Sequence, residues 1–147
     1  MRRRLHGRHH AADLAAFEAL ARRFARTLVP GDVVAIGGPL GAGKTAFVRA
    51  VVVELHGADV ATSPTFTFWH RYDGSPPIHH LDLYRIEDRA ELVELGLEAA
   101  FDPAAIALVE WPERAPELLP PGAIAVAIAG SGDQPRTIWI GDGEGAA

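Results

Sequence analysis

The stretch Gly38-Pro39-Leu40-Gly41-Ala42-Gly43-Lys44-Thr45 reads G-x-x-x-x-G-K-T and lies between an apolar run and a helical pattern. Residues 33–37 form the apolar run, and the helical pattern begins near Lys44. A strand, a glycine loop and a helix in this order predict a phosphate-binding loop. Glycines let successive backbone N–H groups turn toward one anion, and the helix adds its unpaired N–H groups and positive dipole end.

Lys44 is the only lysine in the chain, which otherwise uses arginine for its cationic side chains. A lysine ammonium is a compact point charge that fits between phosphate oxygens, whereas arginine is a planar fork. We therefore expect Lys44 to reach the β- and γ-phosphates of a nucleotide and the Thr45 hydroxyl to ligate Mg²⁺. The residues expected to bind the nucleotide here are Gly38, Leu40, Gly41, Ala42, Gly43, Lys44, Thr45 and Ala46.

The composition is that of an ordinary globular chain of 147 residues, with 48% hydrophobic and 22% charged residues. No apolar run approaches the ~20 residues that span a bilayer, and the lack of cysteine excludes disulfides and thiolate metal sites. A cytoplasmic protein without membrane contact is the simplest interpretation. The net charge of −5 argues against a broad nucleic-acid surface, although residues 1–10 hold four arginines.

The hydrophobic pattern indicates one α/β domain over residues 13–141, preceded by a basic, disordered lead (1–12) and followed by a frayed tail (142–147). Asp13 is a predicted N-cap, after which Leu14, Phe17, Ala21, Phe24 and Leu28 mark the apolar face of a helix. Residues 66–72 and 78–84 form a predicted hairpin, residues 87–95 a helix, residues 106–109 a buried strand, and residues 123–129 and 136–140 a terminal hairpin. The fold class is thus a single-domain P-loop NTPase, whose mixed sheet has a parallel core and antiparallel hairpin additions.

Two carboxylates and one hydroxyl are candidates for the chemistry beside the phosphates. Glu110 ends a fully apolar strand, and Asp82 lies in the strand of the first hairpin. Thr65 follows the P-loop helix in a loop that senses the γ-phosphate in switch-type nucleotidases. Pattern alone leaves simpler alternatives open, namely salt-bridged or capping acids and a strand entry stiffened by Pro64.

Two sequence features that are absent limit which nucleotide the protein can bind and which reaction it can catalyse. The chain contains no asparagine, so it lacks the N-K-x-D motif with which GTPases of the Ras type recognise guanine. No Arg-rich lid segment is visible, and such a lid is usual in small-molecule P-loop kinases. Both absences favour a different class of P-loop protein.

Several motifs in order closely resemble the bacterial TsaE (YjeE) family of ATPases for tRNA threonylcarbamoyladenosine biosynthesis. The resemblance covers residues 13–140, nearly the whole chain. It is carried by the P-loop, the S-P-T-F, H-L-D-L-Y-R and L-V-E-W motifs that start at residues 63, 80 and 108, and the E-L and L-G-L motifs that start at residues 91 and 95. The D-L-Y-R and V-E-W motifs at these separations are much more specific than the P-loop itself.

The resemblance implies a cytoplasmic ATPase with ATP as substrate and Mg²⁺ as cofactor. It would act on a threonylcarbamoyl-transferase complex of the TsaD–TsaB type, meeting tRNA indirectly through that complex. It also implies Mg²⁺ contacts for Thr45 and Glu110, catalytic support from Asp82 and a switch role for Thr65. By alignment, Asp13 and Arg136 fall where the family contacts the base end of the nucleotide.

These indications combine into one mechanistic hypothesis with two alternatives. Lys44 and the loop amides hold the phosphates, while Glu110 fixes Mg²⁺ directly or through water. Asp82 orients the attacking water or a Mg²⁺-bound water, Thr65 closes on the γ-phosphate, and Arg85 is a candidate arginine finger. The alternatives are a nucleotide-gated binding module that does not need hydrolysis and a small-molecule kinase.

Overall fold

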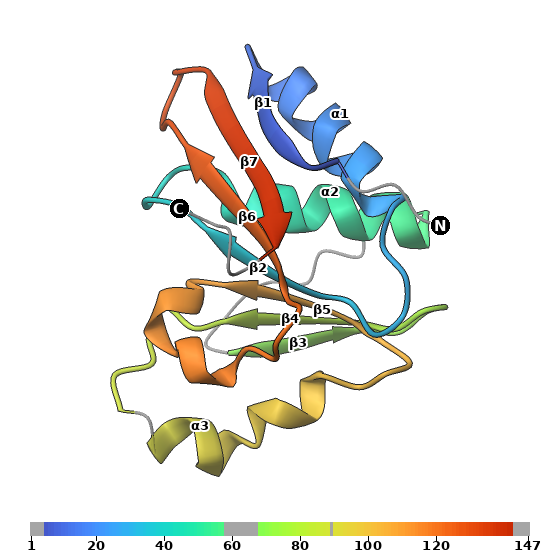
Figure 1. Cartoon of the computed structure of the whole chain (residues 1–147), viewed down its shortest axis with the longest axis vertical. Coiled ribbons are helices and arrows are strands. Elements are labelled where there is room, and N and C mark those ends of the chain that lie inside the picture. The colour runs from blue at the N-terminus through green and yellow to red at the C-terminus, as the bar shows by residue number, and fades with distance from the viewer. Residues whose placement is uncertain (1–4, 58–67, 89, 143–147) are drawn as a thin grey trace.

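The computed structural model describes residues 5–57, 68–88 and 90–142, in which seven strands form one sheet (Figure 1). Their order across the sheet is β1-β7-β6-β2-β5-β4-β3. The strands β6, β2, β5 and β4 run parallel, while β3, β7 and β1 are antiparallel to their neighbours. The strands are β1 Gly7–Ala11, β2 Val33–Gly37, β3 Trp69–Tyr72, β4 Ile78–Asp82, β5 Ile106–Glu110, β6 Ile124–Ala129 and β7 Arg136–Asp142. This is the predicted parallel core with antiparallel additions.

Helical elements cover both faces of the sheet (Figure 1). The long helices α1 and α2 pack against each other on one face, and α3 with short 3₁₀ turns lies on the opposite side. Their bounds are α1 Leu14–Ala25, α2 Lys44–His56, α3 Ala90–Leu95, η1 Leu97–Ala100, η2 Pro112–Arg114 and η3 Pro116–Leu118. The acidic helix expected at residues 87–95 therefore begins three residues later than the pattern indicates.

The central strands are buried on both faces, which explains their unbroken apolar sequences. In β5, Ile106 and Leu108 join the core beneath α1 and α2, while Ala107 and Val109 join the core on the other face. This alternation follows from the two-residue period of a strand. Glu110, next in the series, therefore emerges on the α1/α2 side at the end of β5.

The apolar face predicted for α1 is partly wrong. Phe17, Ala21 and Phe24 are buried as expected, but Leu14 is 64% exposed. Leu14 begins the helix, and its side chain lines a cavity rather than the core. Leu20, which the pattern passed over, is buried in its place.

The basic lead is also more ordered than its composition indicates. Residues 7–11 pair as β1 along the outer edge of β7, from Gly7 opposite Ile140 to Ala11 opposite Arg136. Ala11 is fully buried beneath α1. For residues 7–11 the expectation of disorder fails, because backbone pairing to an open sheet edge needs little apolar side-chain area.

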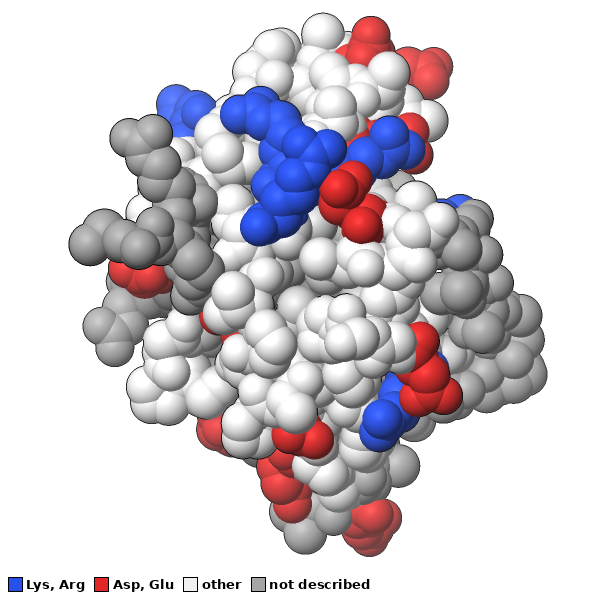
Figure 2. Space-filling model, turned by 90° about the vertical axis from the view of Figure 1, so that its right-hand side faces the viewer, with Lys and Arg blue, Asp and Glu red and all other residues white. Residues whose placement is uncertain are grey.

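Arg22 and Arg23 of α1 are exposed. Figure 2 shows basic side chains gathered in the upper half of the face in view, with acidic side chains directly beside them. An ion pair joins Arg26 Nε to Glu54 Oε2 at 2.9 Å. The face thus carries both signs of charge.

No helix among the described residues is long and apolar enough to cross a membrane.

Candidate nucleotide site

The P-loop connects β2 to α2, and its backbone passes close to β6 and α1. Gly38 has φ +151°, and a Cβ there would lie 2.6 Å from the carbonyl oxygen of Ile128. Gly43, the N-cap of α2, has φ +106°, and a Cβ there would lie 3.3 Å from the ring of Phe17. Both positions require glycine, so the motif's glycines are explained by the packing of this loop as well as by anion binding.

Lys44, at the first position of α2, is buried over its own loop. Its ammonium donates to the carbonyl oxygens of Gly38 at 2.7 Å and Pro39 at 2.9 Å. It also lies 3.9 Å from the ring centroid of Trp111. Burial lowers the pKa of Lys44 from its ordinary value of 10.5, and the nearby Glu110 carboxylate opposes that shift most strongly. The ammonium is therefore held at the loop, beside the position where phosphates bind in P-loops.

Thr45 and Glu110 face each other across the gap between α2 and β5. The Thr45 hydroxyl donates to Glu110 Oε1 at 3.1 Å, with Oε2 at 3.3 Å. Glu110 is only 2% exposed, and His80 of β4 contacts its Oε2 at 2.5 Å. A buried carboxylate is costly unless it is hydrogen-bonded, and this one has partners on both oxygens.

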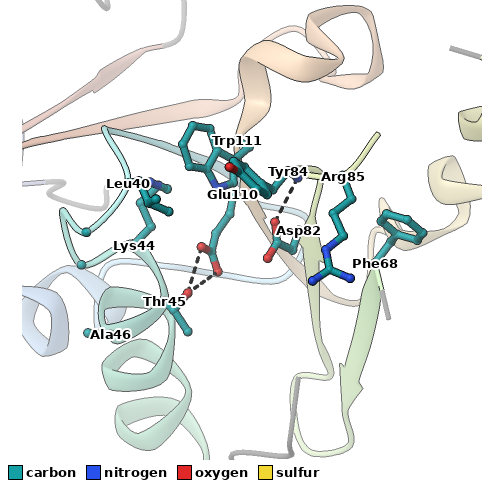
Figure 3. Close-up of a pocket in the computed structure, with 12 residues that line it drawn as sticks. Leu40, Lys44, Thr45, Ala46, Phe68, Asp82, Tyr84, Arg85, Glu110 and Trp111 are labelled. Atoms are coloured by element: carbon teal, nitrogen blue, oxygen red, sulfur yellow. Dashed lines mark hydrogen bonds between the residues drawn. The ribbon is translucent and has the colours of Figure 1, made fainter. Parts of the chain in front are cut away.

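Asp82 and Arg85 stand on the far side of the same cavity, opposite Lys44 and Thr45 (Figure 3). Asp82 is paired with Glu110 in the register of β4 and β5, so the two carboxylates leave the sheet side by side. Asp82 Oδ1 accepts the backbone N–H of Tyr84 at 3.0 Å, which orients the carboxylate. The cavity has a volume of about 420 Å³, lined by Leu40, Gly41, Gly43, Lys44, Thr45, Ala46, Phe68, Asp82, Tyr84, Arg85, Glu110 and Trp111.

A second cavity of about 390 Å³ lies on the other side of the loop and shares Gly43 and Ala46 with the first. Asp13 and Arg136 both line it, although they are far apart in sequence. Asp13 caps α1 by accepting the N–H of Ala16 at 2.9 Å. Arg136 Nε donates to the Ala42 carbonyl oxygen at 2.7 Å, which ties β7 to the loop.

Most predicted site residues thus lie around the P-loop, but the sequence did not predict every residue of the site. Thr65 lies outside the described residues. Trp111 is not among the site residues expected from the sequence, yet it covers Lys44 and adopts φ +57°, the only positive φ outside glycine in the described part of the chain. His80 carried a signal in its spacing, since it lies two residues before Asp82 and so shares its face of the strand.

The donor atoms fit a magnesium ion that also binds nucleotide. Mg²⁺ prefers oxygen ligands and commonly uses one or two protein groups, with phosphates and waters completing its shell. The Thr45 hydroxyl and the Glu110 carboxylate are such groups. Within residues 5–57, 68–88 and 90–142, no group of three or more His, Cys, Asp or Glu could hold a metal by itself. Phosphate oxygens and waters would complete the shell of such an ion.

A β-strand, a G-x-x-x-x-G-K-T loop and a helix beside parallel strands, with a carboxylate facing the loop threonine, define a P-loop NTPase fold. The chain belongs to the family described as threonylcarbamoyl adenosine biosynthesis protein TsaE, whose model matches residues 11–138. Its members take part in the biosynthesis of threonylcarbamoyladenosine in tRNA, so the resemblance stated from the motifs is confirmed.

Individual relatives support the same assignment. The TsaE protein of Bacillus subtilis is 39% identical over 122 residues, covering 82% of this chain and 76% of that protein. The TsaE protein of Rickettsia conorii is 41% identical over 109 residues, covering 73% of this chain and 62% of that protein. The crystal structure of YdiB from Bacillus subtilis matches with a TM-score of 0.74 and 32% identity, covering 93% of this chain and 86% of that one.

Proposed function

We propose that this protein is a Mg²⁺-dependent ATPase whose hydrolysis of ATP drives or resets a threonylcarbamoyl-transferase complex during tRNA modification. The observation that carries the proposal is the meeting of Lys44, Thr45 and Glu110 in one cavity at the P-loop. Family membership supports the tRNA pathway. The protein would work in the cytoplasm with partners of the TsaD–TsaB type and meet tRNA through them.

The two adjoining cavities match the two ends of a nucleotide. Lys44 and the loop amides would bind the phosphates in the first cavity, and Thr45 and Glu110 would hold Mg²⁺ there. The second cavity, with Asp13 and Arg136, would receive the base end. Bound Mg²⁺ would supply positive charge against the charge that develops on the phosphate oxygens.

Asp82 would orient the attacking water. Its Oδ1 is fixed by the backbone N–H of Tyr84, and the carboxylate lines the first cavity. A carboxylate held in this way can accept a hydrogen bond from a water at Oδ2 and direct its lone pair to the γ-phosphate. Arg85 lines the same cavity and is the candidate for neutralising phosphate charge from within the chain.

Reconstitution with the transferase partners tests the proposal, with ATP turnover and modified tRNA scored together. We expect slow hydrolysis by the protein alone and acceleration by the partners, because a supplied arginine can contribute ~10³–10⁵ in rate. Lys44→Ala should abolish nucleotide binding and both activities. Equal turnover with and without partners would contradict the coupling to the complex.

A nucleotide-gated binding module is the second candidate, favoured by one observation. Lys44 is held by its own loop and by Trp111, so phosphate binding at Lys44 would change contacts that reach beyond the loop, to the residue that follows β5. Glu110→Gln, which should bind ATP without hydrolysing it, separates the two functions. Repeated rounds of tRNA modification by this variant would favour the module, whereas a single round would favour the ATPase. Phosphate transfer to a metabolite instead of water would identify a kinase.

A further inference from the structure

A buried histidine lies directly beneath the Glu110 carboxylate. His80 is in β4, only 5% exposed, and its Nε2 is 2.5 Å from Glu110 Oε2. In the parallel register of β4 and β5, His80 is opposite Leu108, so its ring reaches along the sheet to the next residue on the same face, Glu110. The contact therefore joins two neighbouring strands beside the first cavity, which Glu110 lines.

The hydrogen-bond pattern assigns the proton of this contact to His80 Nε2. The oxygens of the Glu110 carboxylate only accept hydrogen bonds, so the Thr45 hydroxyl and the ring nitrogen of His80 both act as donors to it. The other ring nitrogen of His80, Nδ1, is buried and has no hydrogen-bond partner in the described part of the chain. An Nε2–H tautomer leaves only a lone pair at Nδ1, whereas the opposite tautomer would bury an unsatisfied N–H and turn a lone pair toward the carboxylate.

This contact limits the rotation of the Glu110 carboxylate. With Oε2 held by His80, Oε1 is the oxygen nearer to the Thr45 hydroxyl, at 3.1 Å against 3.3 Å for Oε2. Glu110 Oε1 and the Thr45 hydroxyl oxygen are the two oxygens expected to ligate Mg²⁺. Hydrogen bonds from surrounding residues commonly orient metal ligands in this way, and their loss costs about 10–100-fold in metal affinity.

We infer that His80 is a positioning residue, whose Nε2–H holds Glu110 so that its Oε1 and the Thr45 hydroxyl are presented together to the metal of a bound Mg²⁺–nucleotide. This inference rests on the proposed function, since it requires the metal and nucleotide to bind in the first cavity. It adds a residue that touches neither the nucleotide nor the metal and acts through Glu110.

The neighbouring His79 provides a matched control. It lies in the same strand and is equally buried, at 4% exposed, but it faces the opposite side of the sheet. There its Nδ1 accepts the indole N–H of Trp69 at 2.8 Å. Replacing His79 also removes a buried ring from β4, without removing the hydrogen bond to Glu110.

The experiment measures metal binding with the full chain and ADP, using Mn²⁺ detected by electron paramagnetic resonance as the probe. His80→Leu removes the donor at similar volume, and His80→Gln keeps an N–H donor at similar reach. We expect His80→Leu to weaken Mn²⁺ binding by about 10–100-fold while ADP affinity in EDTA stays within about twofold of wild type. His80→Gln should recover most of the loss, and His79→Leu should leave Mn²⁺ affinity unchanged.

The remaining outcomes separate this inference from the proposed function. If a folded His80→Leu variant binds Mn²⁺ as tightly as wild type, the inference about His80 is wrong but the proposed function stands. The same holds if His79→Leu loses as much Mn²⁺ affinity as His80→Leu. In a Glu110→Gln background, adding His80→Leu should cause no further loss of Mn²⁺ binding, and a further loss would also overturn it. If the wild-type chain binds neither ADP nor Mn²⁺–ADP, the proposed function and the inference both fail.

Discussion

Lys44 carries the nucleotide interpretation at the scale of single residues, and its contacts show what nucleotide binding must change. Its ammonium contacts two loop carbonyls and the Trp111 ring, an arrangement in which a cation–π contact contributes about 0.5–2 kcal/mol. Phosphate oxygens offer a full negative charge to the same ammonium. Nucleotide binding should therefore draw Lys44 away from Trp111.

Fluorescence of Trp111 tests this exchange of partners. In a chain with Trp69→Phe and Trp139→Phe, Trp111 is the sole tryptophan, and ADP should change its emission. Adding Lys44→Met removes the ammonium, so the emission should differ before ADP is added and should not respond to it. If the chain that keeps Lys44 binds ADP, as verified by calorimetry, and its Trp111 emission does not change, the prediction is contradicted.

At the scale of elements, the junction between β2 and the P-loop is fixed by its closeness to β6. Gly38→Ala would place a Cβ 2.6 Å from the Ile128 carbonyl oxygen at φ +151°, whereas Gly37→Ala meets nothing within 4 Å. We expect Gly38→Ala to lower the free energy of unfolding by about 1–3 kcal/mol and to weaken nucleotide binding. Gly37→Ala should do neither to a comparable extent. Urea unfolding and ADP titration of the two variants measure the difference, and equal behaviour would refute the packing argument.

The hairpin of β3 and β4 should make stability depend on pH. Burial lowers the pKa of His79 below its ordinary 6.5; Arg71 adds to the shift and Asp102 opposes it. The unfolded chain then binds the proton more readily. The contribution of neutral His79 to the stability of the folded state is fully present above pH 6.5. It is lost as the pH falls from 6.5 to the lower pKa that His79 has in the folded state.

His79→Asn keeps an acceptor for the Trp69 indole N–H and removes the titrating ring. The variant should lose less stability than wild type between pH 7 and pH 5 in urea unfolding. Part of the dependence should remain, because burial also lowers the pKa of His70. Identical pH profiles of the two proteins would show that His79 does not contribute.

At the scale of the whole molecule, the sheet depends on a strand from the very start of the chain. β1 covers the edge of β7, and β7 in turn carries Arg136 to the loop carbonyl of Ala42. Deleting residues 1–11 should lower the free energy of unfolding by on the order of 2–4 kcal/mol, from a net ~0.5–1.5 kcal/mol per ladder hydrogen bond. It should also promote association through the uncovered edge.

Urea unfolding and size-exclusion chromatography measure these two effects, with deletion of residues 1–4 as the control that keeps β1. A chain without residues 1–11 that is as stable and as monodisperse as the control would show that β1 is dispensable. Nucleotide affinity should fall with the longer deletion, because the second cavity includes Ala11 and Arg136.

The sequence by itself determined the P-loop, the parallel core and the catalytic candidates Lys44, Thr45, Asp82 and Glu110. These rest on local spacing, since a glycine loop between strand and helix and an acid at a strand end are visible within a few residues. The family followed from the same short motifs.

Only the tertiary structure decided which residues complete the site. The pairing of β1 with β7, the cover of Trp111 over Lys44 and the hydrogen bond from His80 to Glu110 each join segments that are distant in sequence. Edge pairing uses backbone groups that every residue carries, so composition could only indicate a disordered lead. Likewise, a histidine on a strand becomes a positioning residue only when the neighbouring strand sets a carboxylate beside it, and the register of β4 and β5 does that here.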